Sequence, residues 1–162
     1  MSKFGTIPKE PPRSADLGQC APKFAEKVRE LITRLEKQGY DPIVREAMRS
    51  SERCAWLFGF GRDYDDNRGI VTNAATGARS WHSYGLAADI VSRSKGDNAP
   101  DGFWAALRTE AVAVGLEAGG NWKMADRPHV QWDPMRKTPS DHAGELLQTS
   151  GLAGVWAEVG AA

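Results

Sequence analysis

Two short segments combine histidine and aspartate, residue types that bind divalent metal ions in proteins. In "SWHSYGLAADI", His82 precedes Asp89 by seven positions, and in "DRPHVQW", Asp126 precedes His129 by three. A catalytic zinc ion takes three protein ligands, usually histidine nitrogens and carboxylate oxygens, and keeps one position for water. The chain can supply such a set from His82, Asp89 and His129.

Hydrolysis at such a site also needs a general base. Zinc makes water nucleophilic near neutral pH, and a base within hydrogen-bond reach takes the proton from that water. Asp126 can be this base, and Pro128 would stiffen the chain that follows it. Gly85 would allow a tight backbone turn, so that His82 and Asp89 can face the same ion.

Spacing alone leaves structural alternatives open for these residues. A lone histidine is usually structural, an aspartate near a strand often caps a turn, and this His-Asp spacing occurs by chance. His142 lies at the start of an expected helix, where a surface or capping role is favoured over that of a fourth ligand. Cys20 and Cys54 lack the close CxxC spacing of a zinc knuckle, so we expect them to be buried thiols.

The acidic segment "DYDDNRG" raises the question of a calcium site. Asp63, Asp65 and Asn67 have the first three spacings of a calcium-binding loop. No glycine follows at the sixth position, and Ala74 stands where the bidentate glutamate should be. The pattern therefore favours a solvated acidic loop over a calcium site.

Length and composition indicate a globular protein. A chain of 162 residues suggests one domain, and 41% hydrophobic with 26% charged residues is typical of a globular protein. The formal net charge of zero favours neither nucleic acid nor an anionic membrane as a partner. The N-terminal sequence has no apolar run of signal-peptide or membrane-spanning length, so we expect the chain to stay in the cytoplasm unless it is released.

The apolar pattern predicts an α+β domain with helices packed on a small sheet. The strongest helix covers 22–38, where Phe24, Val28, Leu31 and Leu35 share one face. Further helices are expected at 52–59, at 102–114 and from "TPSD" (138–141) onward, and strands at 42–48, 70–72, 86–91 and 129–132. Residues 1–19 are expected to form an extended lead-in, 20–136 the main domain, and 137–162 a helical tail docked on it.

The two metal-site segments resemble the motifs of a known family. "SWHSYGLAADI" resembles the SxHxxGxAxD motif of the zinc D-Ala-D-Ala carboxypeptidase and L-alanyl-D-glutamate endopeptidase family, which includes many phage endolysins. "GLEAGGNWKMADRPHVQW" is similar to the second motif of this family, and "EAMRSSERCAWLFGFGR" to the segment before the first. The resemblance runs from Lys23 to Trp132 and implies a single α+β domain with a small antiparallel sheet flanked by helices.

The resemblance implies a role for each matching residue. It implies one zinc ion per chain with His82, Asp89 and His129 as ligands, and Asp126 as the general base. Arg49 matches the arginine that stabilises the developing oxyanion, a role that suits an always-charged guanidinium. The expected substrate contacts are Ser80, which matches a serine near the substrate, and the flanking aromatic residues Tyr84 and Trp122.

The expected activity is zinc-dependent hydrolysis of the stem peptide of bacterial peptidoglycan. Asp126 stands where relatives that cut D-Ala-D-Ala often have glutamate, which favours a phage-type L-alanyl-D-glutamate endopeptidase. A D-Ala-D-Ala carboxypeptidase is the alternative enzyme, and a non-catalytic zinc-stabilised wall-binding or virion module is the alternative from another class. We expect a monomer that inserts into no membrane, binds no nucleic acid, and reaches the wall from the cytoplasm of the infected bacterium after membrane permeabilisation.

Overall fold

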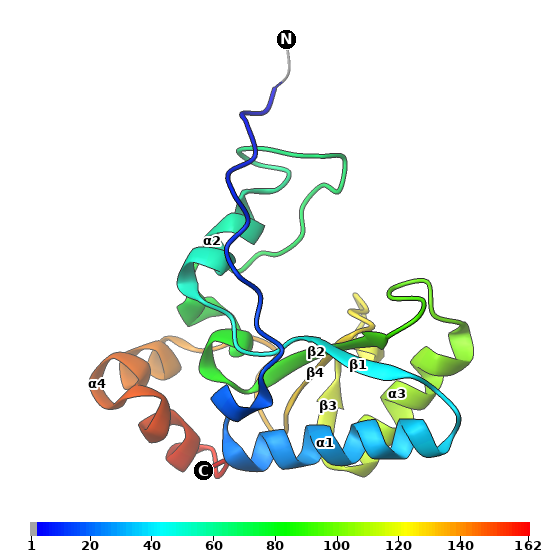
Figure 1. The fold of residues 1–162 in the computed structure, drawn as a ribbon. Helices are drawn as coiled ribbons and strands as arrows, with labels where there is room; N and C mark the ends of the chain where they lie inside the picture. Colours follow the sequence, from blue (N-terminus) through cyan, green and yellow to red (C-terminus); the bar gives the residue numbers. More distant parts are fainter. Residues whose placement is uncertain (1–2) are drawn as a thin grey trace.

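A four-stranded antiparallel sheet organises the part of the chain that the structure, a computed structural model, describes, which is residues 3–162 (Figure 1). The strand order is β1-β2-β4-β3. The strands are β1 (Pro42–Glu46), β2 (Ala87–Ser92), β3 (Leu116–Ala118) and β4 (His129–Trp132). The fold is thus the predicted single α+β domain with a small antiparallel sheet.

Helices flank this sheet. Figure 1 shows α1 and α3 below the sheet, and α2 with the loop after it and the N-terminal segment above it. The helices are α1 (Pro22–Lys37), α2 (Ser51–Gly59), α3 (Asp101–Ala113) and α4 (Asp141–Glu158), with short 3-10 turns η1 (Leu17–Gln19), η2 (Gly77–Arg79), η3 (Trp81–Tyr84) and η4 (Gly119–Asn121). In residues 3–162, no helix combines the length and apolar character needed to cross a membrane.

Helix α1 forms as its periodicity predicted. Phe24, Val28, Leu31 and Leu35 are fully buried along one face and belong to the main hydrophobic core. Pro22 occupies the first turn, and Gly39 follows the helix with a φ of 88°. This helix supports the sheet from below, on the face opposite the candidate site.

Strand alternation separates the core from the site. Ala88 and Val130 are paired across β2 and β4 and are buried in the main core, whereas the neighbouring pair Asp89 and His129 points to the other face. A single register therefore buries apolar side chains below the sheet and places two potential metal ligands above it.

The sequence prediction was wrong for two strands. Residues 70–72 form no strand, and the side chains of Ile70 and Val71 are largely exposed because no neighbouring strand pairs with this segment. Strand β3 was missed because its three residues directly follow α3 and Gly115, too short a segment for an alternating pattern to be recognised.

The C-terminal tail packs on the domain. Ser140 is the N-cap of α4, and its side chain accepts a hydrogen bond from the backbone N–H of Ala143. Val155 is buried, and the Trp156 indole donates to the Tyr84 carbonyl over 2.7 Å. The tail therefore contacts the turn that carries the first histidine.

Gly85 ends that turn in the left-handed conformation, with a φ of 67°. A Cβ atom here would lie 3.0 Å from the Cys20 Cα and 3.2 Å from the Trp156 ring. We expect Gly85→Ala to lower the free energy of unfolding by about 1–3 kcal/mol, measured by urea denaturation. Gly39→Ala is the control, because Gly39 also has a positive φ but nothing lies within 4 Å of the added Cβ. Equal losses in the two variants would contradict the predicted steric clash at Gly85.

Candidate metal centre

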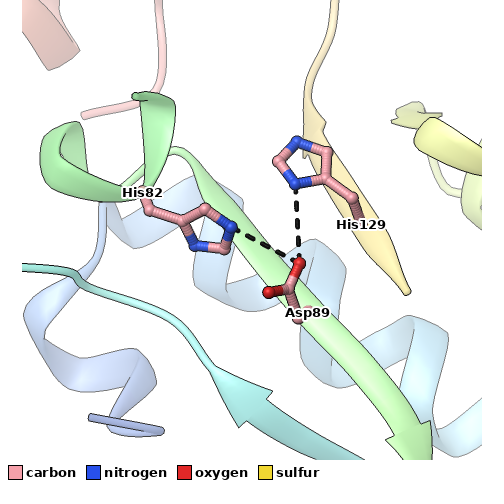
Figure 2. Close-up of side chains that lie close together, drawn as sticks. All are labelled: His82, Asp89 and His129. Carbon is pink, nitrogen blue, oxygen red and sulfur yellow. Dashed lines mark ion pairs between the residues drawn. The ribbon is translucent and has the colours of Figure 1, made fainter. Parts of the chain in front are cut away.

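His82, Asp89 and His129 come together in one cluster (Figure 2). One potential ligand atom from each residue lies within 4.8 Å of the other two. The Asp89 Oδ1 atom is 3.4 Å from the His82 Nε2 atom and 3.5 Å from the His129 Nδ1 atom. Among residues 3–162, this is the one such group of histidine, cysteine or acidic side chains.

Local structure explains why these three residues meet. Asp89 on β2 pairs directly with His129 on β4, so both side chains lie on the same face of the sheet. His82 lies in η3, and the left-handed Gly85 turns the chain from η3 toward β2. The roles predicted for Gly85 and for the two strands therefore agree with the observed geometry.

Each histidine is oriented through its second ring nitrogen. The His82 Nδ1 atom donates to the Ala47 carbonyl over 2.9 Å, which leaves Nε2 facing Asp89. The His129 Nε2 atom donates to the Gln131 Oε1 atom over 2.8 Å, which leaves Nδ1 facing Asp89. Metal-binding histidines are typically held in this way, because the second hydrogen bond sets both the tautomer and the ring orientation.

Gln131 is a site residue that the sequence prediction missed. Its side chain is fully buried, and its Nε2 atom donates to the Glu117 carboxylate and to the Arg136 carbonyl. Because both of these partners are acceptors, the Oε1 atom must face His129. The available signal was the spacing of two residues on a strand, which places His129 and Gln131 on the same face.

The charges in the cluster suit a divalent cation. Burial alone would raise the pKa of Asp89, but the charges and contacts of His82 and His129 outweigh it and hold this pKa well below its usual range. Burial would likewise lower the pKa of His129, but Asp89 outweighs it and raises this pKa. A largely buried carboxylate with two oriented imidazoles matches the ligand set of a catalytic zinc, whose charge would offset that of Asp89.

Asp126 lies beside this ligand set. Its Oδ2 atom is 4.0 Å from the His129 Nδ1 atom, and its backbone N–H donates to the Gly119 carbonyl over 2.9 Å. A Cβ atom on Gly119 would lie only 2.6 Å from the Asp126 carbonyl, so the glycine permits this close approach. The side chain is 55% exposed, and desolvation of the part that lies beside the metal-free cluster raises the pKa of Asp126.

Arg49 also lies beside the cluster. Its Nη2 atom is 3.9 Å from the Asp89 Oδ2 atom, and its backbone N–H donates to the His82 carbonyl over 3.1 Å. The Ser83 hydroxyl donates to the Arg49 carbonyl over 2.7 Å. The segment that carries the arginine is therefore attached directly to the turn that carries His82.

The three residues expected to contact the substrate differ in their burial and in their distance from the cluster. The Trp122 ring lies beside His129, with the ring centroids 5.1 Å apart, and its indole donates to Glu117. Ser80 is buried at the start of η3. Tyr84 is fully buried, and its hydroxyl donates to the Ala78 carbonyl. The expectation that Tyr84 contacts the substrate is thus corrected, because its ring is enclosed by the core.

The remaining sequence expectations concern residues outside the cluster. His142 is exposed on α4 and pairs with Glu158, 3.0 Å away. Both cysteines are buried and free. In the acidic loop, the Asp65 carboxylate accepts from the Gly69 backbone, and Asp66 pairs with Arg68. Hydrogen bonds within the chain therefore account for two of the loop carboxylates without a bound ion.

The segments that carry His82, Asp89 and His129 are similar in sequence to known proteins. Residues 73–132 match a peptidase M15 family model described as D-alanyl-D-alanine carboxypeptidase. The chain is 29% identical over 109 residues to the peptidoglycan L-alanyl-D-glutamate endopeptidase CwlK of Bacillus subtilis (strain 168), covering 60% of this chain. It spans 64% of the length of that relative, which is less than two thirds.

Solved structures give a fold comparison. The structure of the LdcB LD-carboxypeptidase matches with a TM-score of 0.52 and 17% identity, covering 94% of this chain and 76% of that one. The L-Ala D-Glu endopeptidase ChiX of Serratia marcescens matches with a TM-score of 0.39 and 24% identity, covering 69% and 87%. The LdcB match supports the α+β fold described above. The family model and the CwlK match confirm the resemblance that the two motifs indicated.

Proposed function

We propose that this chain, which resembles the zinc D-Ala-D-Ala carboxypeptidase and L-alanyl-D-glutamate endopeptidase family, is a zinc-dependent peptidase acting on the stem peptide of bacterial peptidoglycan. The observation that carries the proposal is the meeting of His82, Asp89 and His129, each with a potential ligand atom directed at the others. When bound there, zinc would supply Lewis-acid polarisation of the scissile carbonyl and would lower the pKa of water.

The residues around the ligands would supply the other catalytic functions. Asp126 would take a proton from the attacking water and pass it to the leaving amine. Its carboxylate lies 4.0 Å from the His129 Nδ1 atom, close enough to the ligand set to reach water held there. The Arg49 guanidinium, 3.9 Å from the Asp89 carboxylate, would stabilise the negative charge that develops on the carbonyl oxygen.

For the bond that is cut, we propose the L-alanyl-D-glutamate linkage. CwlK is named for this activity, and Asp126 stands where relatives that cut D-Ala-D-Ala often have glutamate. A D-Ala-D-Ala carboxypeptidase is the second candidate, because the matching family model carries that description. Mass spectrometry of digested, purified peptidoglycan distinguishes them: fragments with a new N-terminal D-glutamate would support the endopeptidase, whereas loss of a terminal D-alanine would support the carboxypeptidase.

A wall-binding or virion module without activity would need neither a base nor an oxyanion-stabilising arginine. Asp126 and Arg49 both lie beside the cluster, which favours the enzyme. The test is wall hydrolysis with and without a chelator, followed by addition of zinc. Activity that is lost with the chelator and returns with zinc supports the enzyme, whereas wall binding without any hydrolysis supports the module.

The biological setting remains part of the proposal. Because the first motif resembles those of phage endolysins, we propose that the chain reaches the wall from the host cytoplasm once the membrane is permeabilised. We also propose that it acts as a monomer. Loss of turbidity of a cell culture only when a membrane-permeabilising agent accompanies the expressed protein would support this setting. Lysis without such an agent would contradict it.

Zinc affinity is expected to increase with pH. The raised pKa of His129 means that the metal-free site holds a proton that zinc must displace, whereas Asp89, with its lowered pKa, is already ionised. Affinity should therefore rise by about tenfold per pH unit below the pKa of His129 and level off above it. Competition titrations with a zinc indicator, at pH values below and above the pKa of His129, measure how zinc affinity changes with pH. An affinity that is constant with pH would contradict proton displacement from His129.

A further inference from the structure

A series of alternating charges leads from the half-exposed Glu10 in the N-terminal segment to the metal cluster. Glu10 pairs with Arg53 over 2.9 Å, and Arg53 in turn contacts the Glu46 carboxylate. Glu46 also pairs with Arg49, whose Nη2 atom lies 3.9 Å from Asp89. Glu46 and Arg53 are nearly inaccessible to solvent, so their charges depend on the charged side chains that contact them.

Glu46 lies next to Asp89 because of an irregularity in the sheet. The β1-β2 register shifts between Val44 and Glu46, and this bulge places Glu46 opposite Asp89. Two carboxylates at facing positions of neighbouring strands repel each other. The Arg49 guanidinium reaches both of them and offsets this repulsion, but its contacts with the two are unequal.

The contacts of Arg49 are strongest with Glu46. The Glu46 Oε1 atom accepts from the Arg49 Nε atom over 2.6 Å and also contacts the Nη2 atom. In contrast, the 3.9 Å between Arg49 Nη2 and Asp89 Oδ2 is longer than a hydrogen bond. The other Asp89 oxygen, Oδ1, faces both histidines. Asp89 is thus oriented toward the ligand set rather than toward the arginine.

We propose that Glu46 is a positioning residue that holds Arg49 away from Asp89. This inference rests on the proposed metal site. With Glu46 charged, the Asp89 carboxylate stays available to the metal, and the outer face of the guanidinium stays available to the substrate. Without that charge, the largely buried Arg49 would lack its main partner, and a buried charge without a partner is strongly unfavourable. Asp89 is the other carboxylate that Arg49 reaches, so the guanidinium would be drawn toward it. A direct Arg49-Asp89 pair would then compete with the metal.

The test measures zinc affinity of the metal-free protein, which requires no catalytic activity. Glu46→Gln keeps the size of the side chain and removes its charge, and we expect zinc to bind roughly tenfold or more weakly. Adding Arg49→Met to this variant should restore most of the affinity, because the competing cation is gone. If Glu46 and Arg49 acted independently, Arg49→Met would change zinc affinity equally in the wild type and in the Glu46→Gln variant, to within about twofold. We expect instead that Arg49→Met raises zinc affinity at least about fivefold more in the Glu46→Gln variant than in the wild type.

Further variants separate positioning from general support of the fold. Glu10→Gln is the matched control, because Glu10 is half-exposed and contacts Arg53 rather than Arg49; its zinc affinity should stay within about twofold of the wild type. If Glu46→Gln does not fold, as judged by circular dichroism, Glu46→Asp replaces it. This variant keeps the charge but draws the carboxylate back from Arg49, and the smaller loss expected should also be relieved by Arg49→Met.

The possible outcomes are distinct. Unchanged zinc affinity in the Glu46 variants, an equal loss in Glu10→Gln, or no restoration by Arg49→Met would each overturn the positioning role while leaving the proposed metal site intact. Failure of the wild-type protein to bind zinc would overturn both the positioning role and the proposed function. Weakened binding that Arg49→Met restores would support the proposal.

Discussion

Asp126→Asn is expected to abolish peptidoglycan hydrolysis while the protein still binds zinc. The substitution preserves the shape of the side chain but removes its ability to accept a proton, and a positioned general base typically contributes about 10²–10⁴-fold to the rate. Zinc should be retained because the His82, Asp89 and His129 cluster is complete without Asp126. The rate of release of soluble wall fragments and the zinc content of the purified protein are the two measurements.

Asp141→Asn is a suitable control for this experiment. Asp141 is a highly exposed aspartate in the first turn of α4, paired with Arg79 rather than with the cluster. Its activity and its zinc content are expected to match the wild type. Full hydrolytic activity of Asp126→Asn would rule out Asp126 as the base. Loss of zinc from that variant would instead indicate that Asp126 helps to hold the metal.

His129→Ala is expected to lose both zinc and activity. His129 supplies one of the three potential ligand atoms, and its ring is buried and oriented by Gln131. Removing a residue that orients a ligand typically weakens metal binding by about 10–100-fold, so removal of the ligand itself should cost more than about 100-fold. Elemental analysis and competition titration of the purified variant measure this loss.

Two comparisons make the His129 experiment specific. His142→Ala removes the exposed histidine that pairs with Glu158 on α4, and this variant should bind zinc as the wild type does. Gln131→Met leaves all three ligands in place and removes the hydrogen bond to His129, so an intermediate loss of affinity is expected. Equal affinity in the His129→Ala variant and the wild type would exclude His129 as a ligand.

Short-range patterns in the sequence predicted much of the fold. The apolar face of residues 22–38 predicted α1 closely, because a helix of this length buries one continuous stripe whatever it packs against. Strands β2 and β4 were also recognised: residues 86–91 are apolar apart from Asp89 and follow Gly85, and residues 129–132 were predicted as a strand. The prediction was wrong at 70–72, where an apolar segment has no neighbouring strand to pair with.

The sequence alone also determined which residue types could do chemistry here. The motif around His82 and Asp89 and the one around His129 identified the potential ligands, because chemistry restricts metal ligands to few residue types and the motifs keep a set spacing. Only the tertiary structure decided that the three side chains meet, since this depends on the pairing of β2 with β4. Pairing between strands is a long-range contact that local spacing does not encode.

Tertiary structure alone also decided the surroundings of these ligands. The Ala47 carbonyl that orients His82 comes from a segment 35 residues earlier, and the bulge in β1 places Glu46 opposite Asp89. Tyr84 has the residue type of a substrate contact, yet its ring lies in the core. In each case the sequence determined the functional group, and packing between distant segments determined what that group faces.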